Sequence, residues 1–330
     1  MPHTVRITDP DDLYKWSSRT TQFDSNNNRS KVHVEFDNGL VSTNRYTNGS
    51  IFLQTLEDSG DIKRWDTITK TFNSDGDVVR RTINYDDGKI VDIHMSNGQV
   101  VSRTVTKPDG AQKWAKITLF HDDTGEAVQR IVEYKEGHVK IETLENGNVV
   151  SKVLTDPGNA KNWETISFEF DEEGNPVTRT QLMDDGEERV FNIVDGDNGD
   201  NTLIGTDAND LMRGRDGDDI LIGGLGRDQM RGNDGNDIYV FNDVNDSPVA
   251  LPDRIVDFTQ GEDLIDLSGM VAGDLTFVGT DEFTDANQVR VVENANGTTT
   301  VQINTDADLA PDAGIVLSAT SGLTQDDFIL

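Results

Sequence analysis

Five consecutive nine-residue segments fill residues 196–240, and no other feature of the sequence restricts the fold as much. Their first residues are Gly196, Gly205, Gly214, Gly223 and Gly232. The fourth segment fits the pattern G-G-x-G-x-D-x-U-x, in which U is apolar, at every fixed position. The apolar place is filled in all of them, by Leu203, Met212, Leu221, Met230 and Tyr239. This regularity predicts stacked loops joined by short strands, and it argues against a flexible linker.

The residue types of the array point to a bound cation. Glycine allows backbone conformations that turn carbonyl oxygens inward, and aspartate supplies the hard anionic oxygen that calcium prefers. Because each segment is half a turn of a coil, stacked loops lie two segments apart, which pairs Asp210 with Asp228 and Asp219 with Asp237. We expect several calcium ions between such loops, and a disordered segment without them. The candidate metal-binding residues are Gly205, Asp207, Asp210, Gly214, Asp216, Asp219, Gly223, Gly224, Gly226, Asp228, Gly232, Asp234 and Asp237.

On these residues, the array resembles the RTX family of secreted calcium-binding proteins, whose nonapeptides form a parallel β-roll. The segments 253–258 and 261–268 are similar to the part that follows the roll in serralysin-type C-terminal domains. The last residues, Asp327 to Leu330, are similar to the uncleaved signal of that family's type I secretion substrates. The resemblance implies bound calcium, export by the type I secretion machinery and an extracellular location. Where the family often has a further Asp-Gly loop, this chain has 304–308, so no site is expected there.

A second repeat, 49 residues long, fills the first half of the chain. It places the four tryptophans at equal intervals, at Trp16, Trp65, Trp114 and Trp163. Within one unit, turn residues separate four predicted strands, which are 65–72, 78–85, 89–95 and 99–106. The pattern predicts an antiparallel β meander, open or curved rather than closed as a propeller, because the strands are less apolar than blade centres. The turn spacing also resembles that of β-hairpin and YD-type repeats in bacterial surface proteins.

Composition excludes several classes of function. A net charge of -32, with scattered lysines and arginines, argues against a nucleic-acid partner, and a chain without cysteine has no disulfides. No segment is apolar enough to span a membrane, and residues 1–16 lack the apolar core of a cleavable signal peptide. The histidines never form the H-E-x-x-H motif, and neither a G-x-S-x-G elbow nor a phosphate loop is present. We therefore assign no catalytic residue.

The sequence thus predicts an all-β protein with three parts: a repeat domain (1–195), a nonapeptide β-roll (196–240) and a serralysin-like secretion segment (241–330). We expect a non-catalytic, calcium-binding protein that folds after export and acts as a binding or scaffold protein at the cell surface or in a biofilm matrix. The repeated tryptophans are packing anchors or stacking platforms for an extracellular polysaccharide. The alternatives are a lyase-like or epimerase-like enzyme with the repeat sheet as its substrate groove, and a self-associating building block.

Overall fold

The computed structural model describes residues 1–9, 15–61, 63–107 and 113–330. It divides the chain into two compact units, one of residues 1–174 with 182–186, the other of residues 175–181 with 187–330. Strands dominate both units, which confirms the predicted all-β class. Within the described residues, no helix has the length and apolar character needed to cross a membrane.

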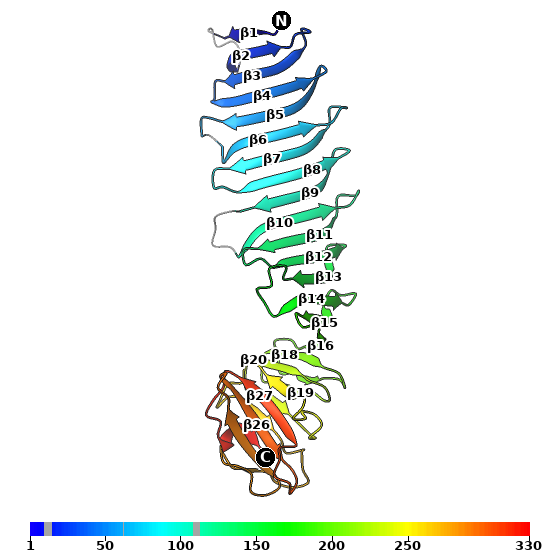
Figure 1. Cartoon of the computed structure of the whole chain (residues 1–330), viewed down its shortest axis with the longest axis vertical. Helices are drawn as coiled ribbons and strands as arrows, with labels where there is room; N and C mark the ends of the chain where they lie inside the picture. The colour runs from blue at the N-terminus through cyan, green and yellow to red at the C-terminus, as the bar shows by residue number, and fades with distance from the viewer. Residues whose placement is uncertain (10–14, 62, 108–112) are drawn as a thin grey trace. The chain divides into compact units, whose positions relative to one another are not determined.

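The first unit is built from a series of antiparallel strands. Its strands are β1 (His3–Thr8), β2 (Trp16–Phe23), β3 (Arg29–Phe36), β4 (Leu40–Thr47), β5 (Ser50–Asp58), β6 (Trp65–Phe72), β7 (Val78–Tyr85), β8 (Ile90–Ser96), β9 (Gln99–Thr106), β10 (Trp114–His121), β11 (Ala127–Tyr134), β12 (Val139–Glu145), β13 (Asn148–Thr155) and β14 (Trp163–Phe170). From β1 to β14, every strand pairs with its neighbours in the chain, so this part of the sheet is a meander (Figure 1). The four strands predicted for the second repeat unit are β6 to β9, and only the third differs, by one residue at each end.

Asparagine–glycine turns close one hairpin in each of the first three repeat units. Asn48, Asn97 and Asn146 have φ values of 50°, 49° and 50°, and the glycine that follows each also has a positive φ. Two successive positive φ values define the type I′ turn, whose twist matches that of the strands it joins. The turn residues therefore fix the register of β4 with β5, β8 with β9 and β12 with β13.

The second repeat unit has a small apolar cluster. In the second unit, Ile68, Ile83 and Val91 face one another across β6, β7 and β8, and they are 7%, 8% and 2% exposed. Trp65 and Tyr85 pack against this cluster. Cross-strand rows of this kind stabilise the sheet strand by strand, because side chains directly opposite each other lie about 5 Å apart.

The second unit contains two more strands that precede the nonapeptides, and then the roll. Its strands are β15 (Pro176–Met183, up to Gln181), β16 (Glu188–Asp195), β17 (Thr202–Ile204), β18 (Asp210–Asp216), β19 (Ile220–Ile222), β20 (Gln229–Asp234), β21 (Ile238–Val240), β22 (Asp253–Ile255), β23 (Leu264–Asp266), β24 (Thr276–Phe277), β25 (Gln288–Glu293), β26 (Thr298–Asn304), β27 (Ala313–Ser318) and β28 (Phe328–Ile329). Parallel pairing joins β16, β18, β20, β22 and β27 in one sheet, and β17, β19, β21, β23 and β28 in another.

The two parallel sheets enclose a thin apolar core. The eighth-place apolar residues of the second to fifth nonapeptides, Met212, Leu221, Met230 and Tyr239, are 0% exposed. In the next turns of the coil, Ile255 and Ile265 continue their two rows and are 0% exposed as well. The roll therefore has a thin hydrophobic core between its two sheets. The nine-residue spacing of the apolar residues produces the layers of this core.

Residues 241–330 are part of the same roll. After β22 and β23, the antiparallel strands β25, β26 and β27 lead back to β22, and a short 3-10 helix, Gln325–Asp327, precedes β28. The Asp327 side chain is buried and accepts hydrogen bonds from the backbone N–H of Thr324 and from Gln260 Nε2. Phe328 pairs with Ile265 of β23, so the segment predicted as a secretion signal completes one sheet of the roll.

Candidate metal centre

The sixth-place aspartates of the nonapeptides form two columns, one along each side of the roll. Asp210 donates its backbone N–H to Asp228 Oδ1 at 2.8 Å, and Asp219 donates its own to Asp237 Oδ1 at 3.0 Å. These four aspartates are 0% exposed. The pairs are those that the spacing of two nonapeptides predicts, because one turn of the coil brings each aspartate onto the next.

Both columns continue beyond the nonapeptides, through two residues that the sequence analysis did not select. Asp228 donates its backbone N–H to Asp253 Oδ1 at 2.7 Å, and Asp237 does so to Asp263 Oδ1 at 3.0 Å. Asp253 is 0% exposed and Asp263 is 2% exposed. The available signal was the triplet of aspartate, any residue and a buried apolar residue, which recurs at 253–255 and 263–265 without the glycines.

The first-place glycines leave room for oxygen atoms beside the columns. A Cβ at Gly214 would overlap Asp219 Oδ2 and lie 2.8 Å from the carbonyl oxygen of Gly232. A Cβ at Gly205 would lie 2.7 Å from Asp210 Oδ2. Gly223 and Gly232 face the Oδ2 atoms of Asp228 and Asp237 in the same way. Glycine is therefore required at this place, because any side chain would fill the space that carboxylate and carbonyl oxygens share.

Several of these carboxylate oxygens have no hydrogen-bond partner. Within the described residues, the buried Oδ2 atoms of Asp219, Asp228, Asp237 and Asp253 accept no hydrogen bond. A buried anionic oxygen without a partner is costly, and a cation is the group that would satisfy it. Oxygen-only surroundings with carboxylate and carbonyl donors fit calcium rather than a softer metal. The residues present therefore fit the ion that the sequence implies.

The electrostatics of the columns agree with this interpretation. Burial, reinforced by the Asp210 carboxylate, raises the pKa of Asp228 to about 7. Burial and the Asp228 carboxylate raise the pKa of Asp253 to about 8, and burial raises that of Asp237 to about 6. Each carboxylate is difficult to ionise because burial removes it from water and other carboxylates lie near it, so a divalent cation would reverse the shift.

The remaining candidate residues lie around the columns. The third-place aspartates, Asp207, Asp216 and Asp234, are exposed, and their side chains are outside the buried columns. Gly224 and Gly226 have positive φ, and a Cβ on either would lie 2.7 or 2.6 Å from a carbonyl oxygen of the loop stacked on it. Within the described residues, no group of three or more acidic or histidine side chains could hold a metal. Backbone carbonyls would therefore have to complete each site.

The repeated tryptophans occupy equivalent positions in the sheet of the first unit. Trp16, Trp65, Trp114 and Trp163 are the first residues of β2, β6, β10 and β14, and all four are half-buried. Because Trp65 packs on the cluster of Ile68 and Ile83, its ring has a structural role in the unit.

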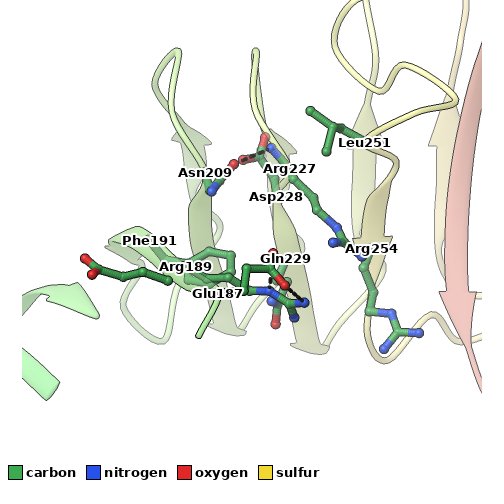
Figure 2. A pocket seen from close by; sticks show the side chains of 10 residues that line it. Glu187, Arg189, Phe191, Asn209, Arg227, Asp228, Gln229, Leu251 and Arg254 are labelled. Carbon is green, nitrogen blue, oxygen red and sulfur yellow. Dashed lines mark hydrogen bonds and ion pairs between the residues drawn. The ribbon is translucent and has the colours of Figure 1, made fainter. Parts of the chain in front are cut away.

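A cavity of about 370 Å³ lies beside one aspartate column (Figure 2). It includes Asp228, and Gln229 and Arg254 from the adjacent strands β20 and β22. Arg189 also lines it and is paired with Glu187 through two hydrogen bonds of 3.0 and 2.6 Å. Three acidic residues and three arginines line the cavity, so neither sign of charge dominates it.

Residues 188–330 match the family model described as peptidase M10 serralysin C terminal, which confirms the serralysin-type resemblance for this part of the chain. No curated protein matches the chain. The solution structure of the AlgE6R3 subunit of the mannuronan C5-epimerase from Azotobacter vinelandii is similar, with 24% identity and a TM-score of 0.30 over 41% of this chain and 80% of that one. The AlgE6R2 subunit of the same epimerase is similar with 21% identity and a TM-score of 0.29, over 42% and 90%.

Proposed function

We propose that residues 188–330, the part with the serralysin-type match, form a β-roll that folds around several calcium ions outside the cell. The observation that carries this proposal is the pair of buried aspartate columns whose Oδ2 atoms lie without hydrogen-bond partners beside glycine backbone, within the described residues. When bound, calcium supplies the positive charge that lets adjacent carboxylates ionise together in a thin core.

The residues of this chain have distinct parts in such a site. Asp219, Asp228 and Asp237 would hold the ions through Oδ2, since each Oδ1 already accepts a backbone hydrogen bond from the neighbouring turn. The first-place glycines would provide carbonyl oxygens, and their missing side chains keep the space open. Asp253 would continue one column at the end of the array.

Folding that depends on calcium is consistent with export of the protein. Calcium sites of extracellular modules have dissociation constants of about 0.1–1 mM, so they fill outside the cell and remain empty in the cytosol. We propose export by a type I secretion machinery, supported by the serralysin-type match of residues 188–330. We also propose that the first unit is a non-catalytic binding or scaffold surface at the cell surface or in a biofilm matrix. Its support is that the sheet repeats, whereas an active site is usually unique.

Calcium titration of the chelator-treated full-length protein tests the proposal. We expect heat of binding and a gain of β-sheet circular dichroism, with a midpoint near about 1 mM or below. Changing Asp219 and Asp228 together to alanine should reduce the number of ions bound, whereas Asp75→Ala, in an exposed turn of the first unit, should not. A titration without heat and without a spectral change would contradict the proposal.

A further inference from the structure

A second concave site lies in the repeat sheet, far in sequence from the nonapeptides. Its volume is about 360 Å³, which lies within the range of small-ligand sites. The strands β12, β13 and β14 and the turns that follow β12 and β14 contribute its walls. The lining residues are Glu142, Gly147, Asn148, Val149, Lys152, Phe170, Glu173 and Gly174.

A buried carboxylate forms one wall of this site. The Glu142 side chain is only 6% exposed, and its two oxygens are held separately: Arg130 Nε donates to Oε2 at 2.5 Å, and Lys140 Nζ lies 2.7 Å from Oε1. Burial raises the pKa of Glu142, but the hydrogen bonds from Arg130 and Lys140 outweigh it and hold the pKa below its usual value. The carboxylate is therefore ionised and fixed, and each oxygen retains capacity to accept another hydrogen bond.

A lysine occupies the position across from Glu142 on the neighbouring strand. Lys152 of β13 is the register partner of Glu142 of β12, and opposed side chains on neighbouring strands lie about 5 Å apart. The Lys152 Nζ is 4.2 Å from the centroid of the Phe168 ring, which holds the ammonium by a cation–π contact. Phe170, two residues further along β14, adds an aromatic ring to the wall of the cavity.

This combination of charges departs from the 49-residue repeat. At the position of Glu142 the other units have Asn44, Ile93 and Phe191, and at the position of Lys152 the two preceding units have Gln54 and Arg103. In the second unit, Ile93 packs against the apolar cluster that stabilises the sheet. At these positions the third unit has instead a carboxylate, Glu142, that is 6% exposed and is held by Arg130 and Lys140, which are 39% and 20% exposed. Because such ion pairs contribute little net stability in place of apolar contacts, this arrangement favours a role in binding a ligand.

We propose that this site binds one residue of a neutral saccharide. Sugar hydroxyls both donate and accept hydrogen bonds, so adjacent hydroxyls can donate to Glu142 and accept from Lys152, while the C–H face of the ring lies on Phe170. Glu142 and Glu173 disfavour an anionic ligand, and Lys152 with the cations behind Glu142 disfavours a cationic one. The inference rests on the proposed role of the repeat sheet as a binding surface, and it names the class of ligand and the place.

Isothermal titration of the full-length, calcium-saturated protein with three neutral hexasaccharides, cellohexaose, maltohexaose and mannohexaose, tests the site, with a galacturonate hexamer as the anionic comparison. We expect at least one neutral probe to bind. Glu142→Gln should weaken that binding about tenfold or more, because a hydrogen bond to a charged group is lost. Lys152→Gln and Phe170→His, which introduce the residues found at these repeat positions in other units (Gln54 and His121), should weaken it without disturbing the fold. Arg103→Gln, at the Lys152 position of the second unit, is the matched control and should leave binding unchanged.

Three results would overturn the assignment: no neutral probe binds, only the galacturonate hexamer binds, or binding survives both Glu142→Gln and Lys152→Gln. Circular dichroism of each variant identifies a loss of fold. Lys152→Gln retains the Arg130–Glu142–Lys140 contacts, although it removes the cation–π contact with Phe168. Binding that persists in these variants would leave the repeat sheet as a binding surface and remove only this site. The calcium titration of the same samples tests the roll separately.

Discussion

Without calcium, the stability of the roll should decrease as the pH rises. Burial raises the folded-state pKa of Asp228 to about 7 and that of Asp253 to about 8, whereas both are near 3.9 in an unfolded chain. Between these values the folded roll keeps protons that the unfolded chain has lost. The stability that these two protonated carboxyls contribute to the calcium-free roll is therefore fully present below about pH 4 and is lost as the pH rises through about 7 to 8.

The size of the effect follows from the same values. From pH 5 to pH 7, Asp228 is protonated in the folded roll and ionised in the unfolded chain, and each pH unit then costs about 1.4 kcal/mol. The free energy of unfolding should fall by about 3 kcal/mol over this interval. Asp228 and Asp253 share a hydrogen bond of 2.7 Å, so their contributions are coupled and we assign about 3 kcal/mol to the pair. Bound calcium should remove this dependence, because it favours the ionised carboxylates.

Hydrogen–deuterium exchange of peptides from residues 205–240, in chelator at pH 5 and pH 7 and corrected for intrinsic exchange, measures this change. The double variant Asp228→Asn, Asp253→Asn keeps side-chain oxygens for the backbone N–H groups of residues 210 and 228 but cannot ionise at either position, so it should lose much of the pH dependence. Asp75→Asn, in an exposed turn of the repeat sheet, is the control. The reasoning is refuted if the wild-type roll is protected at pH 7 as well as at pH 5, if it is unprotected at both, or if the double variant Asp228→Asn, Asp253→Asn retains the full dependence.

Three further substitutions test other parts of the structure. Met230→Ala, at a fully buried position of the roll, should lower the free energy of unfolding in calcium by about 3 kcal/mol, measured by urea denaturation. Gly214→Ala should weaken calcium binding in a titration because its Cβ would overlap Asp219 Oδ2, whereas Gly158→Ala, which meets no atom within 4 Å, should bind calcium normally. Trp65→Ala should destabilise the repeat sheet by about 2 kcal/mol in thermal unfolding, and an unchanged melting temperature would contradict its packing role.

Much of the local structure could be predicted because it depends on residues close in sequence. The Asn97–Gly98 turn sets the hairpin of β8 and β9 through two positive φ values, which few other residue pairs adopt. Likewise, the nine-residue spacing forces Asp219 and Asp237 onto one side of the coil, since they are one full turn apart. Backbone conformation and periodicity are local properties, and the sequence expresses them directly.

Other features depended on contacts between distant segments. The parallel pairing of β16 with β18 and of β28 with β23 extends the roll beyond its nonapeptides at both ends, although β16 belongs to the 49-residue repeat and β28 to neither repeat. Asp253 lacks the flanking glycines of the array, and it joins its column only because β22 pairs with β20. Such a strand pairs where its side chains can extend a row of buried residues in the roll. The local sequence pattern does not show where that is.

The sequence by itself determined the two repeats, the all-β class, the turns and the pairs of aspartates, because glycine conformation and the spacing of apolar residues act over a few residues. The tertiary structure alone decided that Glu142 is buried between Arg130 and Lys140 and opposite Lys152, and that the aspartate oxygens lie without hydrogen-bond partners within the described residues. The burial of a side chain and the electrostatic field at its position depend on residues from several strands that are distant in sequence. They set the pKa of a carboxyl and the chemistry of a cavity only once those strands are paired.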